Sequence, residues 1–117
     1  VVAVEPDSGL RQKAERNLAD LGIDNVAIVA GALTKGHPKE APYHLIYIDG
    51  AVPEMPVGIT QQLADGGRLV AVVAASGAVT GRGVIVRRLG NNLATHEIFD
   101  ARIPLLPGFE KEPTFRF

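Results

Sequence analysis

The stretch VVAVEPDSGLRQKAERNLADLG, residues 1–22, decides the fold class of this chain. Four of its first five residues are apolar, which is typical of a strand covered on both faces in a parallel sheet. We therefore expect a buried strand at Val1–Val4 that ends at an acidic residue, Glu5. Pro6 follows and cannot continue the ladder of hydrogen bonds.

A helix is predicted directly after this strand. Asp7 or Ser8 can cap its N-terminus, and Gly22 stands where helices often end in the left-handed conformation. The stretch thus predicts one β-α unit. The apolar positions that recur at helical spacing are Leu10, Ala14, Leu18 and Leu21.

The alternation continues along the chain and predicts a doubly wound α/β domain. Alternating strands and helices favour a mostly parallel sheet with helices on both faces. The expected elements are a buried strand at Val26–Ala30, a loop at Gly31–Pro42, a strand at His44–Ile48 closing on Asp49-Gly50, a helix at Pro56–Ala64, a turn at Asp65-Gly66-Gly67 and a strand at Arg68–Ala74.

The last third of the chain has a different pattern. Strands at Gly83–Leu89 and Ala94–Phe99, joined by a Gly-Asn-Asn turn, predict an antiparallel hairpin. The segment Ile103–Phe109 is expected to be extended and irregular, and Thr114–Phe117 to add an edge strand. With 117 residues, the chain fits a single domain.

Composition excludes several classes of function. The net charge is −1 with acids and bases interspersed, so no basic patch for nucleic acid or an anionic membrane is visible. With no cysteine, disulfides, thiolate nucleophiles and zinc–thiolate sites are excluded. Apolar runs are too short to span a bilayer, and the first residues do not form a signal peptide. A cytoplasmic location is the default expectation.

Glu5 is the first candidate functional residue. In doubly wound nucleotide-binding sheets, an acidic residue at the carboxyl end of a strand accepts hydrogen bonds from the ribose hydroxyls. A carboxylate can accept both protons of a diol. The alternative is that Glu5 ends a strand and takes part in capping the next helix, and the stretch alone leaves both open.

The remaining polar candidates favour no metal site. His37, His44 and His96 lie far apart in sequence and lack the i, i+4 or clustered spacing of metal ligands. Asp49 ends an apolar strand at the expected ligand crevice, although an Asp-Gly pair is also a common turn. We therefore expect no metal, and we keep Asp49 as a candidate positioned carboxylate.

The order and spacing of four stretches resemble the protein-L-isoaspartate O-methyltransferase family, in particular a short, divergent bacterial branch. They are VVAVEPDSGLRQKAERNLADLGIDNVAIVAG, APYHLIYIDGAV, QQLADGGRLVAVV and ARIPLLPGF. The resemblance implies a Rossmann-like S-adenosylmethionine methyltransferase sheet, in which this chain is the C-terminal portion of the domain. It also implies methylation of isoaspartyl residues in damaged proteins, for repair, and a protein or peptide as substrate.

The resemblance assigns roles to particular residues. Glu5, with Pro6 beside it, falls where the family binds the cofactor ribose, and Asp49-Gly50 lies below the methyl donor. Gly31, Ala32 and Leu33 would line the adenine, and Ile103, Pro104 and Leu105 match the segment placed against the substrate. At Ala32 the chain departs from the family, which usually has an aspartate there.

One strand of the family's sheet is expected to be missing. The glycine-rich turn that receives a nucleotide belongs about 20 residues before Glu5, after a first strand in the middle of the sheet. We expect a gap there, or a strand supplied by upstream residues or another chain, and no activity from this chain alone. The alternatives are a non-catalytic binding or assembly module of the same fold, and half of a nicotinamide dehydrogenase.

Overall fold

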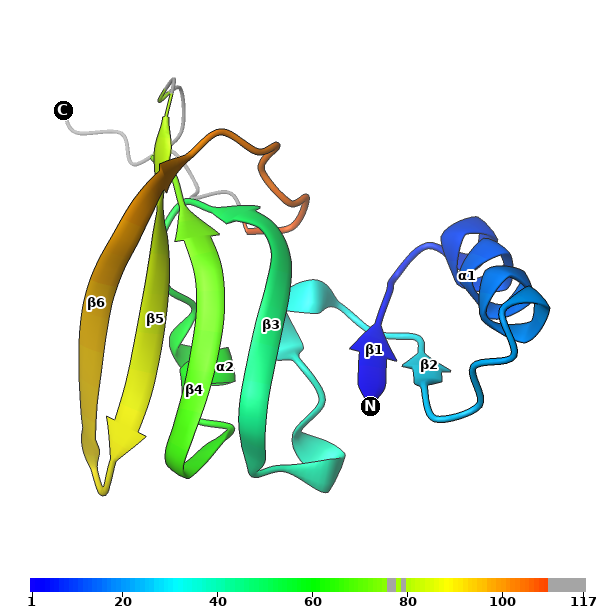
Figure 1. The fold of residues 1–117 in the computed structure, drawn as a ribbon, viewed down its shortest axis with the longest axis horizontal. Coiled ribbons are helices and arrows are strands. Elements are labelled where there is room, and N and C mark those ends of the chain that lie inside the picture. The colour runs from blue at the N-terminus through cyan, green and yellow to red at the C-terminus, as the bar shows by residue number, and fades with distance from the viewer. Residues whose placement is uncertain (76–77, 79, 110–117) are drawn as a thin grey trace, which may run out of the picture.

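The strands of the computed structural model form two separate sheets (Figure 1). The structure describes residues 1–75, 78 and 80–109. A two-stranded sheet has the order β1-β2, and a four-stranded sheet has the order β3-β4-β5-β6. The elements are β1 (Val2–Val4), α1 (Ser8–Asp20), β2 (Ala27–Val29), the 3-10 turns η1 (Leu33–Lys35) and η2 (Pro38–Glu40), β3 (Tyr43–Val52), α2 (Val57–Thr60), β4 (Leu63–Val73), β5 (Gly81–Leu89) and β6 (Asn92–Ala101).

Local signals set both ends of α1, as predicted. The Asp7 side chain accepts a hydrogen bond from the Leu10 N–H at 2.9 Å, which satisfies one free donor of the first turn. At the other end Gly22 has φ +70°, and its N–H donates to the Ala19 oxygen. The N–H of Ile23 donates to the Leu18 oxygen, which completes a Schellman motif.

β1 and β2 pair in parallel around α1, which confirms the β-α-β unit. Val2 lies opposite Ala27, and Val4 lies opposite Val29. The expected burial of both strands is wrong: no residue of β1, α1 or β2 is buried, and Val1 is 82% exposed. The physical reason is that strand side chains project from the two faces of a sheet, and the described residues do not cover both faces of this two-stranded sheet.

The predicted interruption of the sheet is confirmed. In the described residues no ladder of hydrogen bonds joins β1 to β3, and Figure 1 shows no strand between them. The Cα radius of gyration is 15.4 Å. A compact domain of this length has a radius of gyration of roughly 13.4 Å. The chain is therefore more extended than one closed domain.

β3 is longer and less regular than predicted. It runs past Asp49-Gly50 to Val52, so this pair is not a terminal turn. The register with the parallel strand β4 shifts between Tyr47 and Ala51, because Tyr47 lies opposite Val70 and Ala51 opposite Val72. Asp49-Gly50 therefore lies in an irregular, bulge-like part of β3, where Gly50 has φ +150°.

The helix predicted at 56–64 is only one turn long, and β4 starts earlier than expected. α2 ends at Thr60, and Leu63 pairs with Tyr43 of β3 and is fully buried. The next paired residue of β4 is Arg68, so Asp65-Gly66-Gly67 bulges out within the strand instead of preceding it. Pairing with β3 has overridden the local helical pattern.

The C-terminal hairpin is confirmed. β5 pairs antiparallel with both β4 and β6, and Leu89 opposite Asn92 leaves a two-residue turn whose Gly90 has φ +62°. The segment after β6 is extended, as expected, and it returns to β3. There the Ala51 N–H donates to the Pro104 oxygen at 3.0 Å, and the Leu106 N–H donates to the Ala51 oxygen at 2.8 Å. The edge strand predicted at 114–117 lies outside the described residues.

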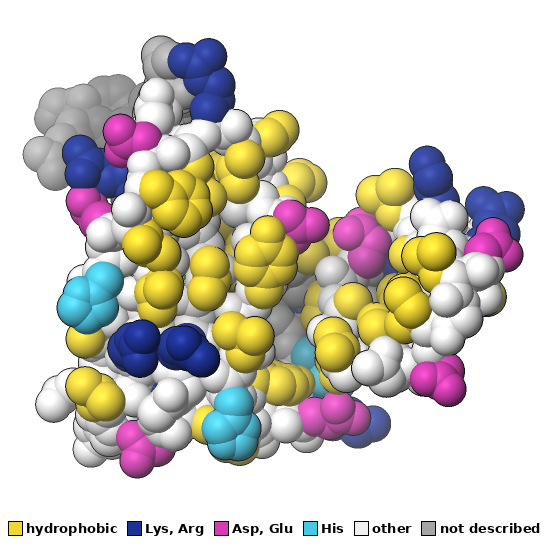
Figure 2. Space-filling model, viewed as in Figure 1, with side chains coloured by type: hydrophobic (Ala, Val, Ile, Leu, Met, Phe, Trp, Pro, Cys, Tyr) yellow, Lys and Arg dark blue, Asp and Glu magenta, His cyan; other side chains and the backbone are white. Residues whose placement is uncertain are grey.

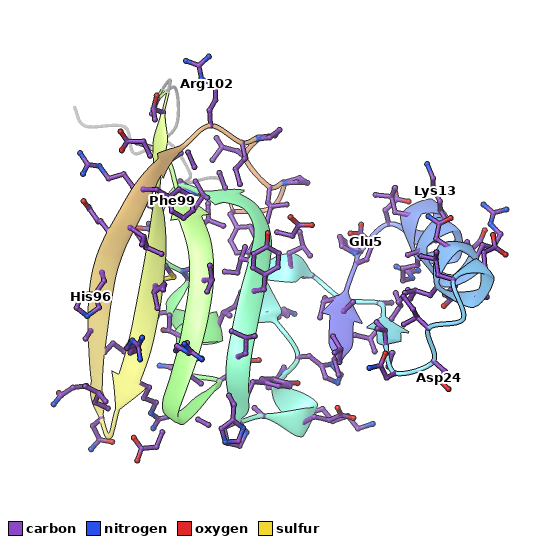
Figure 3. The ribbon with its side chains drawn as sticks, viewed as in Figure 1. Glu5, Lys13, Asp24, His96, Phe99 and Arg102 are labelled. Carbon is purple, nitrogen blue, oxygen red and sulfur yellow. The ribbon has the colours of Figure 1, made fainter. Side chains whose placement is uncertain are left out.

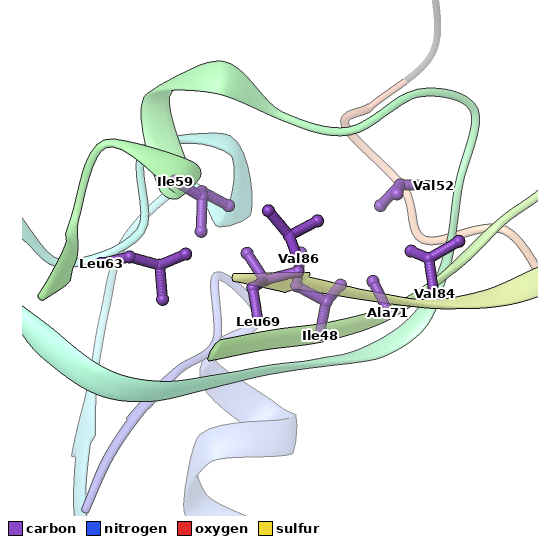
Figure 4. Packing of buried hydrophobic residues seen from close by; sticks show 8 residues of the cluster. All are labelled: Ile48, Val52, Ile59, Leu63, Leu69, Ala71, Val84 and Val86. Carbon is purple, nitrogen blue, oxygen red and sulfur yellow. The ribbon is translucent and has the colours of Figure 1, made fainter. Parts of the chain in front are cut away.

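The core lies on one face of the four-stranded sheet (Figure 4). Alternate residues of β4, such as Leu69 and Ala71, point to this face and meet Ile59 of α2. Leu106 and Phe109 of the returning segment pack against the same cluster. Its buried members are Ile48, Val52, Ile59, Leu63, Leu69, Ala71, Val84 and Val86.

The opposite face of this sheet is apolar but uncovered. Leu45, Tyr47 and Phe99 are 63%, 67% and 56% exposed. Figure 2 shows hydrophobic side chains gathered over this face, with Lys or Arg side chains beside them. Phe99 lies over Gly83, where a Cβ atom would be 2.5 Å from its ring. Helices on both faces are thus not found among the described residues.

Candidate functional site

Glu5 is held at the carboxyl end of β1, beside the start of α1 (Figure 3). Its N–H donates to the Val29 oxygen at 3.1 Å, which extends the β1–β2 pairing by one bond. Its carboxylate oxygen Oε1 accepts from the Asp7 N–H at 3.1 Å. Among the described residues, Oε2 has no partner. One oxygen thus assists the helix start, and the carboxylate keeps capacity to accept from a ligand.

Arg11 fixes the backbone around Glu5. Its Nη1 donates to the carbonyl oxygens of Glu5 and Pro6, at 2.8 Å each. These contacts hold the turn between β1 and α1, where the predicted ribose site lies. Arg11 was not predicted as a site residue, because an arginine at an outer helix position is typical of a solvent-exposed surface.

The loop predicted to line the adenine passes next to β1. A Cβ atom at Gly31 would lie 3.5 Å from a methyl carbon of Val4, so the loop lies against the end of that strand. Ala32 is exposed and precedes η1, which begins at Leu33. The structure therefore brings Glu5 and Gly31–Leu33 to the same end of the two-stranded sheet.

Asp49-Gly50 and Ile103–Leu105 form a second group, at the carboxyl end of β3. Leu105 makes an isolated parallel bridge with Ala51. A Cβ atom at Gly50 would lie 2.3 Å from Leu106 Cγ, so the returning segment packs directly on the glycine. Asp49 is exposed, and its Oδ1 is 3.5 Å from the Tyr47 hydroxyl, at the limit of a hydrogen bond.

The two groups belong to different sheets. Two shallow hollows among the described residues lie away from both groups: one lies on α1, and the other is lined by residues of the β3–α2 connection and β4–β6. No three His, Asp or Glu side chains in this part of the chain are placed to hold a metal ion. None of its helices is long and apolar enough to cross a membrane.

A comparison with known protein families identifies the family of this chain. Residues 1–94 match the family model described as protein-L-isoaspartate(D-aspartate) O-methyltransferase. The chain belongs to this family. The match includes Glu5, Gly31–Leu33 and Asp49-Gly50, and it stops before Ile103–Leu105.

Individual members of the isoaspartate methyltransferase family agree with this. The Methanoregula boonei protein-L-isoaspartate O-methyltransferase is 37% identical over 107 residues, which cover 91% of this chain and 48% of the relative. The chain spans 32% to 51% of the length of the curated relatives compared.

Solved structures of the family show the same fold. One protein-L-isoaspartate O-methyltransferase is 28% identical with a TM-score of 0.82, over 92% of this chain and 34% of its own. A Plasmodium falciparum protein assigned to this activity, solved with S-adenosyl-L-homocysteine, is 20% identical with a TM-score of 0.75, over 91% and 51%. The Rossmann-like α/β assignment is thereby confirmed.

Tyr43 anchors the loop that follows the predicted adenine segment. Its hydroxyl group should make the stability of the protein depend on pH in the alkaline range. Its hydroxyl donates to the His37 oxygen at 2.5 Å, and burial, with a smaller contribution from Glu40, raises the pKa of Tyr43 above 10.0. The folded state thus retains this proton better than the unfolded chain. Its contribution is complete below pH 10 and is lost as the pH rises through the folded-state pKa.

We therefore expect Tyr43→Phe to cost about 0.5–1.5 kcal/mol at neutral pH, the usual net value of one hydrogen bond. Above pH 10, the variant should lose less stability than the wild type. Urea unfolding of both proteins from pH 8 to 11.5 measures this difference. Parallel losses of stability over the whole range would contradict the role given to the Tyr43 proton.

Proposed function

We propose that this chain is part of an S-adenosylmethionine-dependent methyltransferase that methylates the carboxylate of isoaspartyl residues in damaged proteins or peptides. Family membership supports the reaction class. The observation that carries the proposal is the placement of Glu5 at the carboxyl end of β1, next to Gly31–Leu33. Doubly wound sheets bind the ribose of a nucleotide at this position.

The residues present fit an adenosyl cofactor in part. Glu5, with Pro6 beside it, would take the ribose, Gly31, Ala32 and Leu33 the adenine, and Asp49-Gly50 the methyl-donor end. Oε2 of Glu5 is available for one hydroxyl, and Oε1 can accept a second bond besides that from Asp7. The Ala32 side chain has no group to accept from the adenine amino group, so backbone atoms must recognise the base there.

Methyl transfer to a carboxylate requires that the two reactants be well positioned, and it does not require a strong base. When bound, S-adenosylmethionine supplies a methyl group on a positively charged sulfur. With the cofactor held by Glu5, Gly31–Leu33 and Asp49-Gly50, the substrate carboxylate, which is already an anion, would take the methyl group and a neutral thioether would leave. Such a displacement depends mainly on alignment and on a dry site.

In this proposal Ile103, Pro104 and Leu105 contact the substrate peptide. This assignment is supported by the backbone hydrogen bonds that join Pro104 and Leu106 to Ala51, one residue after Gly50. Because the two residue groups belong to separate sheets, we also propose that residues 1–117 alone do not turn over substrate. A cytoplasmic location belongs to the same proposal.

Glu5 provides the test of the cofactor site. In the intact protein, Glu5→Ala is expected to weaken S-adenosylmethionine binding by about 1–3 kcal/mol, because the ribose hydroxyls lose their acceptor. Glu5→Gln keeps one acceptor for the Asp7 N–H but not a full carboxylate, so it should also weaken binding. Glu15→Ala, on the exposed side of α1, is the matched control and should bind as the wild type.

Isothermal titration calorimetry measures all four affinities. Equal affinity of the wild type and the two Glu5 variants would remove Glu5 from the ribose site. A wild-type protein that binds no adenosyl ligand would instead favour a non-catalytic module of the same fold, an alternative that the missing carboxylate at Ala32 supports.

A further inference from the structure

Gln62 is a buried polar residue whose side-chain amide makes three hydrogen bonds. The side-chain oxygen accepts from the His37 N–H at 3.1 Å. The nitrogen donates to the Lys35 oxygen at 2.9 Å and to the Gly58 oxygen at 3.1 Å. Only 9% of the residue is exposed, so each bond replaces water that the group has lost.

These three partners connect distant parts of the fold. Lys35 ends η1, the turn that begins at Leu33, whereas Gly58 lies in α2 beneath the four-stranded sheet. Within the turn, the Lys35 N–H donates to the Ala32 oxygen at 3.1 Å. The Gln62 amide therefore ties the predicted adenine segment to the body that carries the core.

Gly36 shows how closely the loop approaches this amide. It has φ +57°, and a Cβ atom there would lie 2.9 Å from both the nitrogen and the oxygen of the Gln62 side chain. A residue with a side chain would strain the backbone and push the amide away. The loop is thus built around Gln62.

We propose that Gln62 is a positioning residue for adenine recognition, because it holds the 32–36 turn in its binding conformation. This inference rests on the proposed function. Since Ala32 offers no carboxylate, backbone groups of this turn have to form the hydrogen bonds to the base. They can distinguish adenine from other bases only if the turn keeps one conformation. Glutamine suits the position because it supplies two donors and one acceptor at once; glutamate would place an oxygen against two carbonyl oxygens.

The neighbouring residue Gln61 provides a matched control. It is exposed, and among the described residues its side chain has no hydrogen-bond partner. The same change, Gln→Glu, can therefore be made at two adjacent positions, of which one is buried and hydrogen-bonded and the other is exposed. Gln62→Asn is a milder second variant, because it keeps the amide uncharged but is one methylene too short to reach all three partners.

The experiment measures binding of S-adenosylhomocysteine and S-inosylhomocysteine to the intact wild type, Gln62→Glu, Gln62→Asn and Gln61→Glu. The two ligands differ at one edge of the base, where adenine has an amino group and hypoxanthine has a carbonyl oxygen. The ratio of their affinities therefore measures how strongly the 32–36 turn selects adenine. For both Gln62 variants we expect the preference for the adenine ligand to fall about tenfold, with the ribose contribution retained. Gln61→Glu should keep the wild-type ratio. A general loss of stability would weaken both ligands and leave the ratio unchanged.

The outcomes separate the two proposals. If the wild type binds S-adenosylhomocysteine and both Gln62 variants keep its selectivity, the positioning role is wrong and the proposed function stands. If the wild type binds neither ligand, both are wrong. Should Gln62→Glu fail to fold, Gln62→Asn decides by the same ratio.

Discussion

Gly50→Ala is expected to destabilise the intact protein by about 2–6 kcal/mol, the sum of backbone strain and overpacking. The glycine has φ +150°, which residues with a side chain rarely adopt, and the new methyl carbon would lie 2.3 Å from Leu106 Cγ. To relieve the contact, Leu106 must move, and it holds the 103–106 segment against Ala51. Under the proposed function, the substitution should therefore also weaken binding of an isoaspartyl peptide.

Gly66→Ala is the matched control for this prediction. Gly66 also has a positive φ, +77°, but a Cβ atom there would meet nothing within 4 Å. The control isolates the backbone cost, and urea unfolding gives both values. Adding Leu106→Ala to Gly50→Ala should recover part of the loss, so that the double variant is less destabilised than the sum of the two single ones. Strict additivity would show that the Leu106 contact carries no energy.

The second large effect concerns the separation of the two sheets. In a chain of residues 1–117, the backbone amides of β1 and β2 should exchange with solvent far faster than those of β4 and β5. β1 and β2 have three residues each and no buried side chain, so few interactions stabilise their pairing. Isolated two-stranded sheets are at best marginally stable in water. We expect opening of this pair to cost less than roughly 1–2 kcal/mol, the low end of local stabilities.

Hydrogen exchange with mass spectrometry measures this difference within one molecule. In a longer protein, or in a complex that supplies a strand between β1 and β3, protection of Val2–Val4 should rise by at least a hundredfold. Equal protection of both sheets in the 117-residue chain, with a single cooperative transition, would contradict the missing-strand prediction. Notably, β4 serves as the internal reference, because it is paired on both edges.

The elements predicted best from sequence are those whose signals are local. Asp7 and Gly22 bound α1 through contacts within a few residues, and Gly90 allows the two-residue turn of the hairpin. Such signals act through conformational preference and short-range hydrogen bonds, so they survive without knowledge of the rest of the fold. The parallel pairing of β1 and β2 followed from the same pattern.

The irregular parts of β3 and β4 could not be predicted, because distant residues determine them. Gly50 sits inside a strand since Leu106, more than fifty positions later, packs on it. Leu63 leaves the helical pattern because Tyr43 pairs with it. The sequence pattern also predicted buried strands, whereas their covering elements are not among the described residues.

Some residues of the candidate site could be predicted from the sequence, and others could not. Glu5 and Asp49 were predicted from their positions at the ends of apolar strands, and the resemblance to a known family added the 103–105 segment. All three remain proposals supported by their places in the fold. Arg11 and Gln62 were missed because they act on backbone carbonyl groups, which leave no pattern in the sequence. The one available signal was a glutamine between Ile59 and Leu63 at helical spacing, where an apolar residue is expected.

The order of strands in the larger sheet has a consequence for the route of folding. β3, β4, β5 and β6 are neighbours in the same order as in the chain, and the last two are joined by a two-residue turn. Contacts between sequence neighbours close small loops and form early, on the microsecond scale for a hairpin. Residues 43–101 therefore contain their own nucleus. During synthesis on the ribosome, residues 43–101 emerge after β1 and β2, and these two strands must wait for them before the candidate site can be assembled.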